Sequence, residues 1–198
     1  DTNLQPKPAA LESMTHLYET VAVRHGLMLV GETLSGKTRV LRTLATAMTA
    51  LAGSGDFVPV HVHTINPKAV QAAQLFGVFD ANTHEWTDGV VAIQFRACSE
   101  DPANVRHWIM FDGPVDAVWI ENMNTVLDDN KKLCLVSGEI IALSNEMTIM
   151  FEVEDLAVAS LATRDVIIYS GHSGPFYGFA LANWKKTEEG DLDDADIR

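Results

Sequence analysis

The sequence is poor in cysteine, in basic residues and in long apolar runs. Its 198 residues include two cysteines, Cys98 and Cys134, too few for the disulfide framework of a small secreted domain. Fourteen basic residues face 27 acidic ones, so the net charge of -13 would repel a nucleic-acid backbone. No uninterrupted apolar stretch approaches the roughly 20 residues that cross a bilayer. We therefore expect a soluble, intracellular protein with neither a nucleic-acid nor a membrane partner.

What the chain does contain is a regular alternation of helical and strand-like apolar patterns. Hydrophobic residues make up 47% of the chain, enough for one domain with a sizeable core. Strands interleaved with helices predict a three-layer α/β domain, with a central parallel sheet and helices on both faces. Apolar spacing predicts helices over 11–24, 40–51 and 120–127, and strands over 27–30, 58–62, 108–111, 147–153 and 166–169.

Other segments are read from shorter signals. The apolar runs on either side of Ser137-Gly138 predict a β-hairpin insertion. The pattern of residues 90–97 fits a strand and a helix equally well, and it is left open. We expect a polar lead over 1–10, one folded α/β domain over 11–170, and an atypical acidic tail over 171–198.

One motif carries specific chemistry, because residues 31–38 match G-x-x-x-x-G-K-[ST] between a predicted strand and a predicted helix. The glycines let the backbone curl so that its N–H groups and the helix N-terminus surround phosphate oxygens. The lysine would reach the β and γ phosphates of ATP, and the last hydroxyl would ligate Mg²⁺. The predicted nucleotide-binding residues are Gly31, Glu32, Thr33, Leu34, Ser35, Gly36, Lys37 and Thr38.

A second acidic element is expected beside this loop. Asp112 ends the apolar run that begins at Trp108, where an aspartate would hold Mg²⁺ through water. Many P-loop ATPases carry a glutamate at the next position to orient the attacking water, but here Gly113 follows. We therefore predict ATP binding with slow or no hydrolysis. Asp116 and Glu121 are weak candidates for a substitute base, and charges at a helix N-terminus explain them better.

Two histidines are candidate ligands for a further metal ion. His61 and His63 would project from one face of a strand. Two ligands without a third nearby are more often packing or surface residues, so zinc is disfavoured on the sequence alone.

With these motifs in hand, the sequence resembles the second AAA+ module of a dynein heavy chain of the axonemal kind. The resemblance covers roughly residues 11–163. It rests on Leu17-Tyr18-Glu19-Thr20, on Val23 to Gly31, on Ile65-Asn66-Pro67-Lys68, on Glu85-Trp86-Thr87-Asp88-Gly89, and most specifically on Trp108 through Asn124 to Lys132.

The resemblance implies that the chain is one AAA+ module in the ring of a motor protein that moves along microtubules. Its partners would be the neighbouring AAA+ modules of the same heavy chain, and microtubules would be reached through the whole motor. The family's second module is regarded as holding ATP without hydrolysing it, which agrees with Gly113. Glu152 falls where AAA+ proteins carry a polar sensor of the γ-phosphate, a weak catalytic candidate. The implied location is cytoplasmic and cytoskeletal, in the axoneme of a cilium or flagellum.

The resemblance weakens towards the end of the chain. After Ala162-Thr163 the family carries Ser-Arg-Cys-Gly, whose arginine can face a neighbour's nucleotide, but here Arg164 follows directly. Arg164 is either that arginine displaced or a plain surface charge. The sequence after Tyr169 departs from that of the family and is too short for the expected helical lid, which we predict to be largely absent.

Two other readings stay open. The first is a self-contained P-loop ATPase or kinase that uses Asp116 or Glu121 as its base, and the second is an interaction domain that has lost nucleotide. A GTPase is disfavoured because no Asn-Lys-x-Asp motif occurs, and a transporter-type ATPase because Leu-Ser-Gly-Gly is missing.

Overall fold

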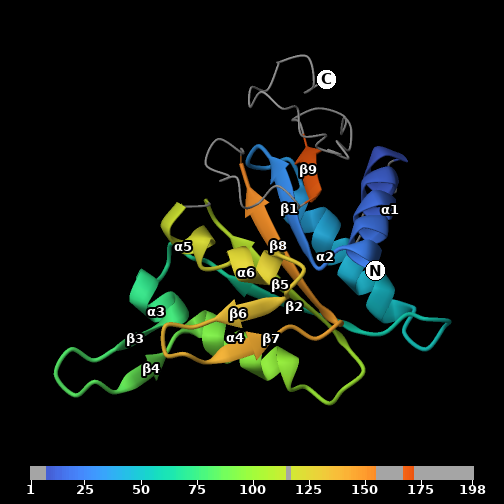
Figure 1. The fold of residues 1–198 in the computed structure, drawn as a ribbon. Helices are drawn as coiled ribbons and strands as arrows, with labels where there is room; N and C mark the ends of the chain where they lie inside the picture. Colours follow the sequence, from blue (N-terminus) through green and yellow to red (C-terminus); the bar gives the residue numbers. More distant parts are fainter. Residues whose placement is uncertain (1–7, 115–116, 155–166, 172–198) are drawn as a thin grey trace, which may run out of the picture.

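The computed structural model describes residues 8–114, 117–154 and 167–171, and its centre is a five-stranded sheet in which every neighbouring pair is parallel (Figure 1). The strand order β2-β5-β8-β1-β9 places the strands out of sequence order, as crossover helices require. The strands are β1 (Gly26–Gly31), β2 (Val60–Ile65), β5 (Arg106–Asp112), β8 (Met147–Val153) and β9 (Ile167–Gly171).

Helices cover both faces of this sheet and give the predicted three layers (Figure 1). On one face lie α1 (Pro8–Val23) and α2 (Lys37–Ala50), which pack against each other. The other face carries α3 (Ala72–Phe76), α4 (Val90–Ser99), α5 (Ala117–Glu121) and α6 (Asn124–Leu127). The α/β architecture expected from the sequence is therefore confirmed.

Two small antiparallel sheets extend from the second face. The hairpin of β6 (Lys132–Cys134) and β7 (Ile140–Ala142) turns at the predicted Ser137-Gly138. A second hairpin, β3 (Gly77–Phe79) with β4 (Trp86–Asp88), lies in a stretch that the sequence left unassigned.

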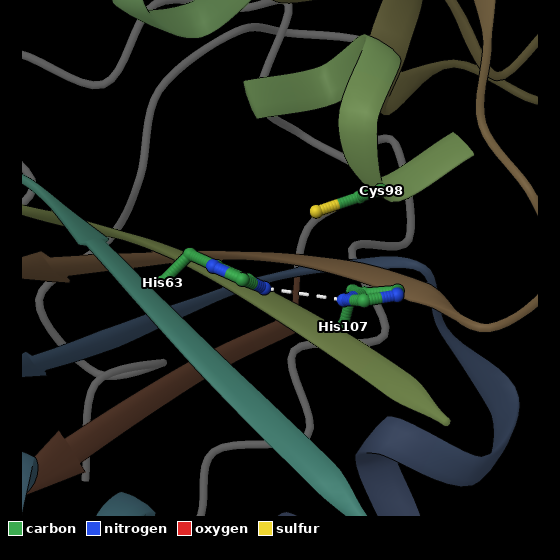
Figure 2. A group of neighbouring side chains, drawn as sticks. All are labelled: His63, Cys98 and His107. Atoms are coloured by element: carbon green, nitrogen blue, oxygen red, sulfur yellow. Dashed lines mark hydrogen bonds between the residues drawn. The ribbon is translucent and has the colours of Figure 1, made fainter. Parts of the chain in front are cut away.

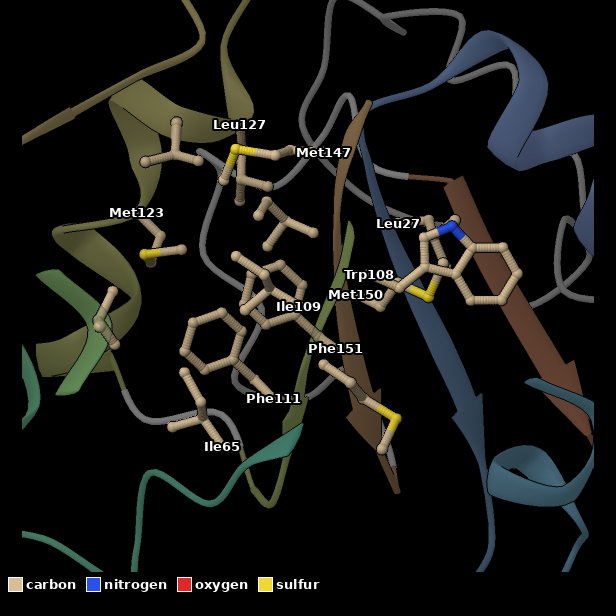
Figure 3. Close-up of a cluster of buried hydrophobic side chains, with 14 of the residues drawn as sticks. Leu27, Ile65, Trp108, Ile109, Phe111, Met123, Leu127, Met147, Met150 and Phe151 are labelled. Carbon is tan, nitrogen blue, oxygen red and sulfur yellow. The ribbon is translucent and has the colours of Figure 1, made fainter. Parts of the chain in front are cut away.

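The core lies on both sides of β5 and β8 because helices cover both faces of these central strands. Trp108 and Met150 point to one side and Phe111 and Phe151 to the other (Figure 3). The rings of Phe111, Trp119 and Phe151 stack on one another at centroid distances of 5.3 to 5.9 Å. This burial explains why the strands read as continuous apolar runs.

Several segments sharpen the sequence-based expectations. Residues 90–97, which fitted either element, form helix α4, with Val91, Phe95 and Cys98 buried along one side. The single helix expected over 120–127 is instead two short helices, α5 and α6. Among the described residues, no helix is both long enough and apolar enough to span a membrane. The predicted acidic tail, the missing lid, Arg164 and Asp116 lie outside the described residues.

Candidate nucleotide-binding site

The glycine-rich loop connects the carboxyl end of β1 to the first residue of α2, as its sequence predicts. Gly36 has a φ of 93° and caps α2 in the left-handed conformation, which only glycine adopts at little cost. Leu34 also has a positive φ, of 69°, and its side chain is 98% exposed. The tight curl therefore turns the backbone inward and this apolar side chain outward.

Lys37 closes the loop from within. Its side chain is buried, and Nζ donates hydrogen bonds to the carbonyl oxygens of Gly31 at 2.6 Å and Glu32 at 2.9 Å. Among the described residues its hydrogen-bond acceptors are neutral carbonyls, which compensate a buried ammonium poorly, so an anion beside the loop would be attracted. The hydroxyl of Ser35 is also buried and has no hydrogen-bond partner among the described residues. Both groups suit a loop that receives phosphate oxygens.

A carboxylate contacts the hydroxyl at the start of α2. Thr38 Oγ1 donates to Glu152, with Oε1 at 2.6 Å and Oε2 at 2.9 Å. Glu152 lies on β8, level with Leu29 of β1 on one side and Asp112 of β5 on the other. Because residues level across a parallel sheet share a face, Glu152 and Asp112 both project towards the α2 side.

The structure thus brings together three of the predicted polar residues: Asp112 and Glu152 at the carboxyl ends of adjacent strands, and Thr38 in the first turn of α2. Crevices at this edge of open α/β sheets are where such folds bind ligands. Hydroxyl and carboxylate oxygens are the ligands that Mg²⁺ accepts, usually alongside water and phosphate. The residues present fit Mg-ATP.

The backbone conformation and close neighbours of Gly113 disfavour a side chain at this position. Its φ is 157°, and a Cβ placed on it would lie 3.3 Å from Oδ1 of Asn66 and 3.4 Å from Cδ of Pro67. A side chain at this position would therefore disturb the β2–α3 connection. Glu121, one of the two candidate substitute bases, is exposed at the end of α5.

Sequence reasoning missed two members of this neighbourhood. Glu154 accepts a hydrogen bond from Thr33 Oγ1 at 3.0 Å, which ties the loop to the end of β8. Asn66 lies beside Gly113 although 47 positions separate them in the chain. Strand order brings these residues together, and no local pattern in the sequence encodes that order.

The comparisons with known proteins agree with this geometry. The sequence model of the AAA domain (dynein-related subfamily) matches residues 26–183, and that of the hydrolytic ATP binding site of the dynein motor region matches residues 1–38. Dynein axonemal heavy chain 1 of Homo sapiens is 55% identical over 168 residues, which is 82% of this chain. Dynein axonemal heavy chain 12 of Homo sapiens is 49% identical over 196 residues, or 96% of the chain.

A mouse relative, dynein axonemal heavy chain 3 of Mus musculus, is 53% identical over 162 residues, or 81% of the chain. The chain spans only 4 to 6% of the length of these relatives. Axonemal dynein heavy chains are thus its homologues over most of its length, and the expected resemblance to a dynein heavy chain of the axonemal kind is confirmed. The loop, the strand order and the matched sequence model agree, and the chain belongs to the dynein-related subfamily of AAA domains.

Proposed function

We propose that this domain is the second AAA+ module of an axonemal dynein heavy chain, and that it holds Mg-ATP with little or no hydrolysis. The observation that carries the proposal is a complete phosphate-binding loop beside Asp112, followed by a glycine where a catalytic glutamate would stand. ATP would then join the domain to its ring neighbours and transmit strain, while other modules supply turnover.

The roles of individual residues follow from their positions. Lys37 would exchange its bonds to the loop carbonyls for phosphate oxygens, which are stronger, charged acceptors. Thr38 would ligate Mg²⁺ through its oxygen while its hydroxyl continues to donate a hydrogen bond to the Glu152 carboxylate, and Asp112 would hold the ion through water. Glu152 would thereby sense the bound metal and phosphate.

One matched family is described as a hydrolytic ATP-binding site, and the extent of that match matters. It ends at residue 38, so it includes the loop but neither Asp112 nor Gly113. The loop binds phosphate, whereas the position after Asp112 decides whether water is activated. The match therefore supports ATP binding. It does not argue against slow hydrolysis, because it does not include the position that follows Asp112.

A second candidate function is turnover of ATP by this site itself, and one observation favours it. The Glu152 carboxylate lies 2.6 Å from the Thr38 hydroxyl, so the site does contain a carboxylate. If Glu152 activated water, the domain would be an ATPase despite Gly113. Its hydrogen bonds to Thr38 argue for a positioning role, because a base must direct a free oxygen at water.

The discriminating experiment measures ATP affinity and single-turnover phosphate release for the wild-type chain and for Lys37→Ala. Losing a charged hydrogen-bonding group costs about 1.5–3 kcal/mol, so affinity should fall roughly 10- to 100-fold. Lys132→Ala, which removes an exposed lysine from β6, is the matched control and should bind normally. Binding without release supports the first function, and Lys37-dependent release supports the second. Absence of ATP binding would contradict both and favour an interaction domain.

The larger setting follows from the relatives, whose names describe axonemal dynein heavy chains. We infer that the partners of this domain are neighbouring AAA+ modules of the same heavy chain. Microtubules would be reached through the whole motor, and the location would be the axonemal cytoskeleton of a cilium or flagellum. Detection of a tagged full-length heavy chain in isolated axonemes would test this location, and its exclusion from axonemes would contradict it.

A further inference from the structure

A second group of ligand-type side chains lies far from the nucleotide site, near the amino end of β5. His63 comes from β2, His107 from β5 and Cys98 from the last turn of α4 (Figure 2). One nitrogen of each histidine and the cysteine sulfur all lie within 4.8 Å of one another. His107 precedes Asp112 by five residues, roughly 16 Å along a strand, so the two sites are separate.

From this arrangement we propose that His63, Cys98 and His107 form a binding site for a thiophilic divalent cation, with Zn²⁺ as the best match. Two imidazole nitrogens and a thiolate are the ligands that zinc prefers, whereas Mg²⁺ requires oxygen. The site would therefore not compete for the magnesium of the nucleotide site.

The distances are close to those of a filled site. His63 Nε2 and His107 Nδ1 are 3.1 Å apart, and Figure 2 shows both atoms directed towards one another below the Cys98 sulfur. Zinc bonds of about 2.05 Å to nitrogen and 2.3 Å to sulfur give, at tetrahedral angles, separations of about 3.3 Å between nitrogens and 3.6 Å to sulfur. The sulfur, which lies within 4.8 Å of a nitrogen of each ring, therefore needs to approach by about 1.2 Å at most, within reach of a side-chain rotation.

The outer partners also suit a metal. Asp101 Oδ2 lies 3.1 Å from Nε2, the other nitrogen of His107, at ion-pair distance but without hydrogen-bond geometry in this state. A histidine that binds zinc through one nitrogen usually gives its other N–H to a carboxylate, and Asp101 is placed to accept it. Metal binding would then convert this contact into a hydrogen bond from the Nε2–H of His107 to Asp101.

Metal binding moves one histidine proton between ring nitrogens and releases the proton of the Cys98 thiol. In the metal-free state one proton lies between His63 Nε2 and His107 Nδ1, because one of these nitrogens must donate to the other. On binding, both nitrogens offer lone pairs, so the two rings carry their protons on His63 Nδ1 and on His107 Nε2. The Cys98 thiol releases its proton to solvent and binds as thiolate.

The metal ion could reach this cluster from solvent, and a fourth ligand could complete its coordination. Cys98 and His107 are buried, at 3% and 4% exposure, whereas His63 is half-buried and reachable from solvent. The ring of His61, which is exposed, lies 5.8 Å from that of His107. Water or His61 would complete a four-coordinate site. The sequence pointed only to His61 and His63, and the fold supplies the third and fourth groups.

The experiment titrates the metal-free chain with Zn²⁺ and, separately, with Co²⁺, in a Cys134→Ser background that removes the other thiol. The expected result is one ion per chain and a cobalt–thiolate charge-transfer band in the near ultraviolet. His63→Gln, at the half-buried position, should weaken zinc at least about 100-fold, and Asp101→Asn about 10- to 100-fold. His84→Gln, an exposed histidine at the β3–β4 turn, should change nothing.

Folding is checked by circular dichroism, because Cys98→Ser and His107→Gln alter buried residues. If either variant misfolds, the charge-transfer band and His63→Gln decide the question. A chain that binds no Co²⁺, binds it without the thiolate band, or binds Zn²⁺ equally well after His63→Gln would overturn the proposal. The histidines and the cysteine would then be a hydrogen-bonded packing cluster.

Discussion

At the scale of single residues, Gly113 combines two properties that separate easily by mutation. It lacks a carboxylate, and its backbone φ of 157° lies where side chains rarely sit, with Asn66 close by. A glutamate introduced there would add a base and strain at the same time. A test of the missing base must therefore compare the glutamate variant with a variant that introduces the same backbone strain without a carboxylate.

We expect Gly113→Glu to raise single-turnover ATP hydrolysis, and Gly113→Ala to leave it at the wild-type level. Both substitutions should lower the free energy of unfolding by a similar amount, about 1–3 kcal/mol, because both place a Cβ on a strained backbone. Phosphate release and denaturant unfolding measured on the same preparations check this. Equal hydrolysis in the two variants would mean that something other than the missing carboxylate limits the reaction.

Glu152 is the residue whose role the structure sharpens most, because it holds the hydroxyl that Mg²⁺ would need. Glu152→Gln keeps one acceptor oxygen but removes the charge that fixes Thr38. ATP affinity in the presence of Mg²⁺ should then fall about 10-fold, in the range that lost outer-shell partners cost at metal sites. Affinity without Mg²⁺ should stay unchanged. Titrations with and without the ion measure the difference.

Glu154→Gln is the matched control, since Glu154 contacts Thr33 of the loop and not Thr38. It should leave the effect of Mg²⁺ on ATP affinity intact. An equal loss in both variants would show a general charge effect of the β8 terminus. A loss of hydrolysis confined to Glu152→Gln would favour the catalytic reading of this residue.

At the scale of elements, a single arginine joins three of them. Arg96 of α4 donates through Nε and Nη2 to Glu139 in the β6–β7 turn, and through Nη1 and Nη2 to Asp88 of β4. Trp86 Nε1 also donates to Asp88, at 2.7 Å. Both hairpins are thus fixed to the same helix by a planar, bidentate donor that lysine could not replace.

We expect Arg96→Met to lower the free energy of unfolding by about 1 kcal/mol, because partly exposed ion pairs contribute little singly and more as a network. Hydrogen bonds from Arg96, and then from Trp86, lower the pKa of Asp88. A carboxylate with a lowered pKa stabilises the fold above its unfolded pKa, and this contribution is lost as pH falls through the folded value. The difference between variant and wild type should therefore shrink in acid, below the ordinary aspartate value of 3.8.

Urea unfolding at pH 7 and pH 3 measures both effects. Arg42→Met, on the exposed side of α2, is the control and should change stability little at either pH. A loss that stays the same at both pH values would contradict the ionic explanation. It would indicate instead that the arginine stem contributes through packing.

Elements that depend on local pattern were predictable from the sequence, and those that depend on distant partners were not. Buried strands such as β5 and β8 appear as apolar runs because both their faces are covered. The motif at 31–38 contains its own turn, so its place between β1 and α2 followed directly. The contact of Thr38 with Glu152 and the cluster of His63 with Cys98 and His107 were not predictable. They depend on which strands are neighbours.

At the scale of the whole molecule, the domain has two separate ends. The carboxyl ends of β5 and β8 carry Asp112 and Glu152 beside Thr38 of α2, while the opposite end of β5 carries His107. The parallel sheet lies between them, and most residues of its central strands β5 and β8 are buried. Ligands at the two ends share no contacting side chain among those described here.

Binding at the two ends should therefore stabilise the domain independently. A ligand at 100 times its dissociation constant adds about 2.7 kcal/mol to the free energy of unfolding. Effects from separated sites that share no partner add within about 0.3–0.5 kcal/mol. Denaturant unfolding with Mg-ATP alone, with Zn²⁺ alone and with both should give increments that sum, and Lys37→Ala should remove only the first while His63→Gln removes only the second. A combined increment that departs from the sum by 1 kcal/mol or more would mean that the sheet couples the two ends, so that a metal beside β2 could tune nucleotide binding in the ring.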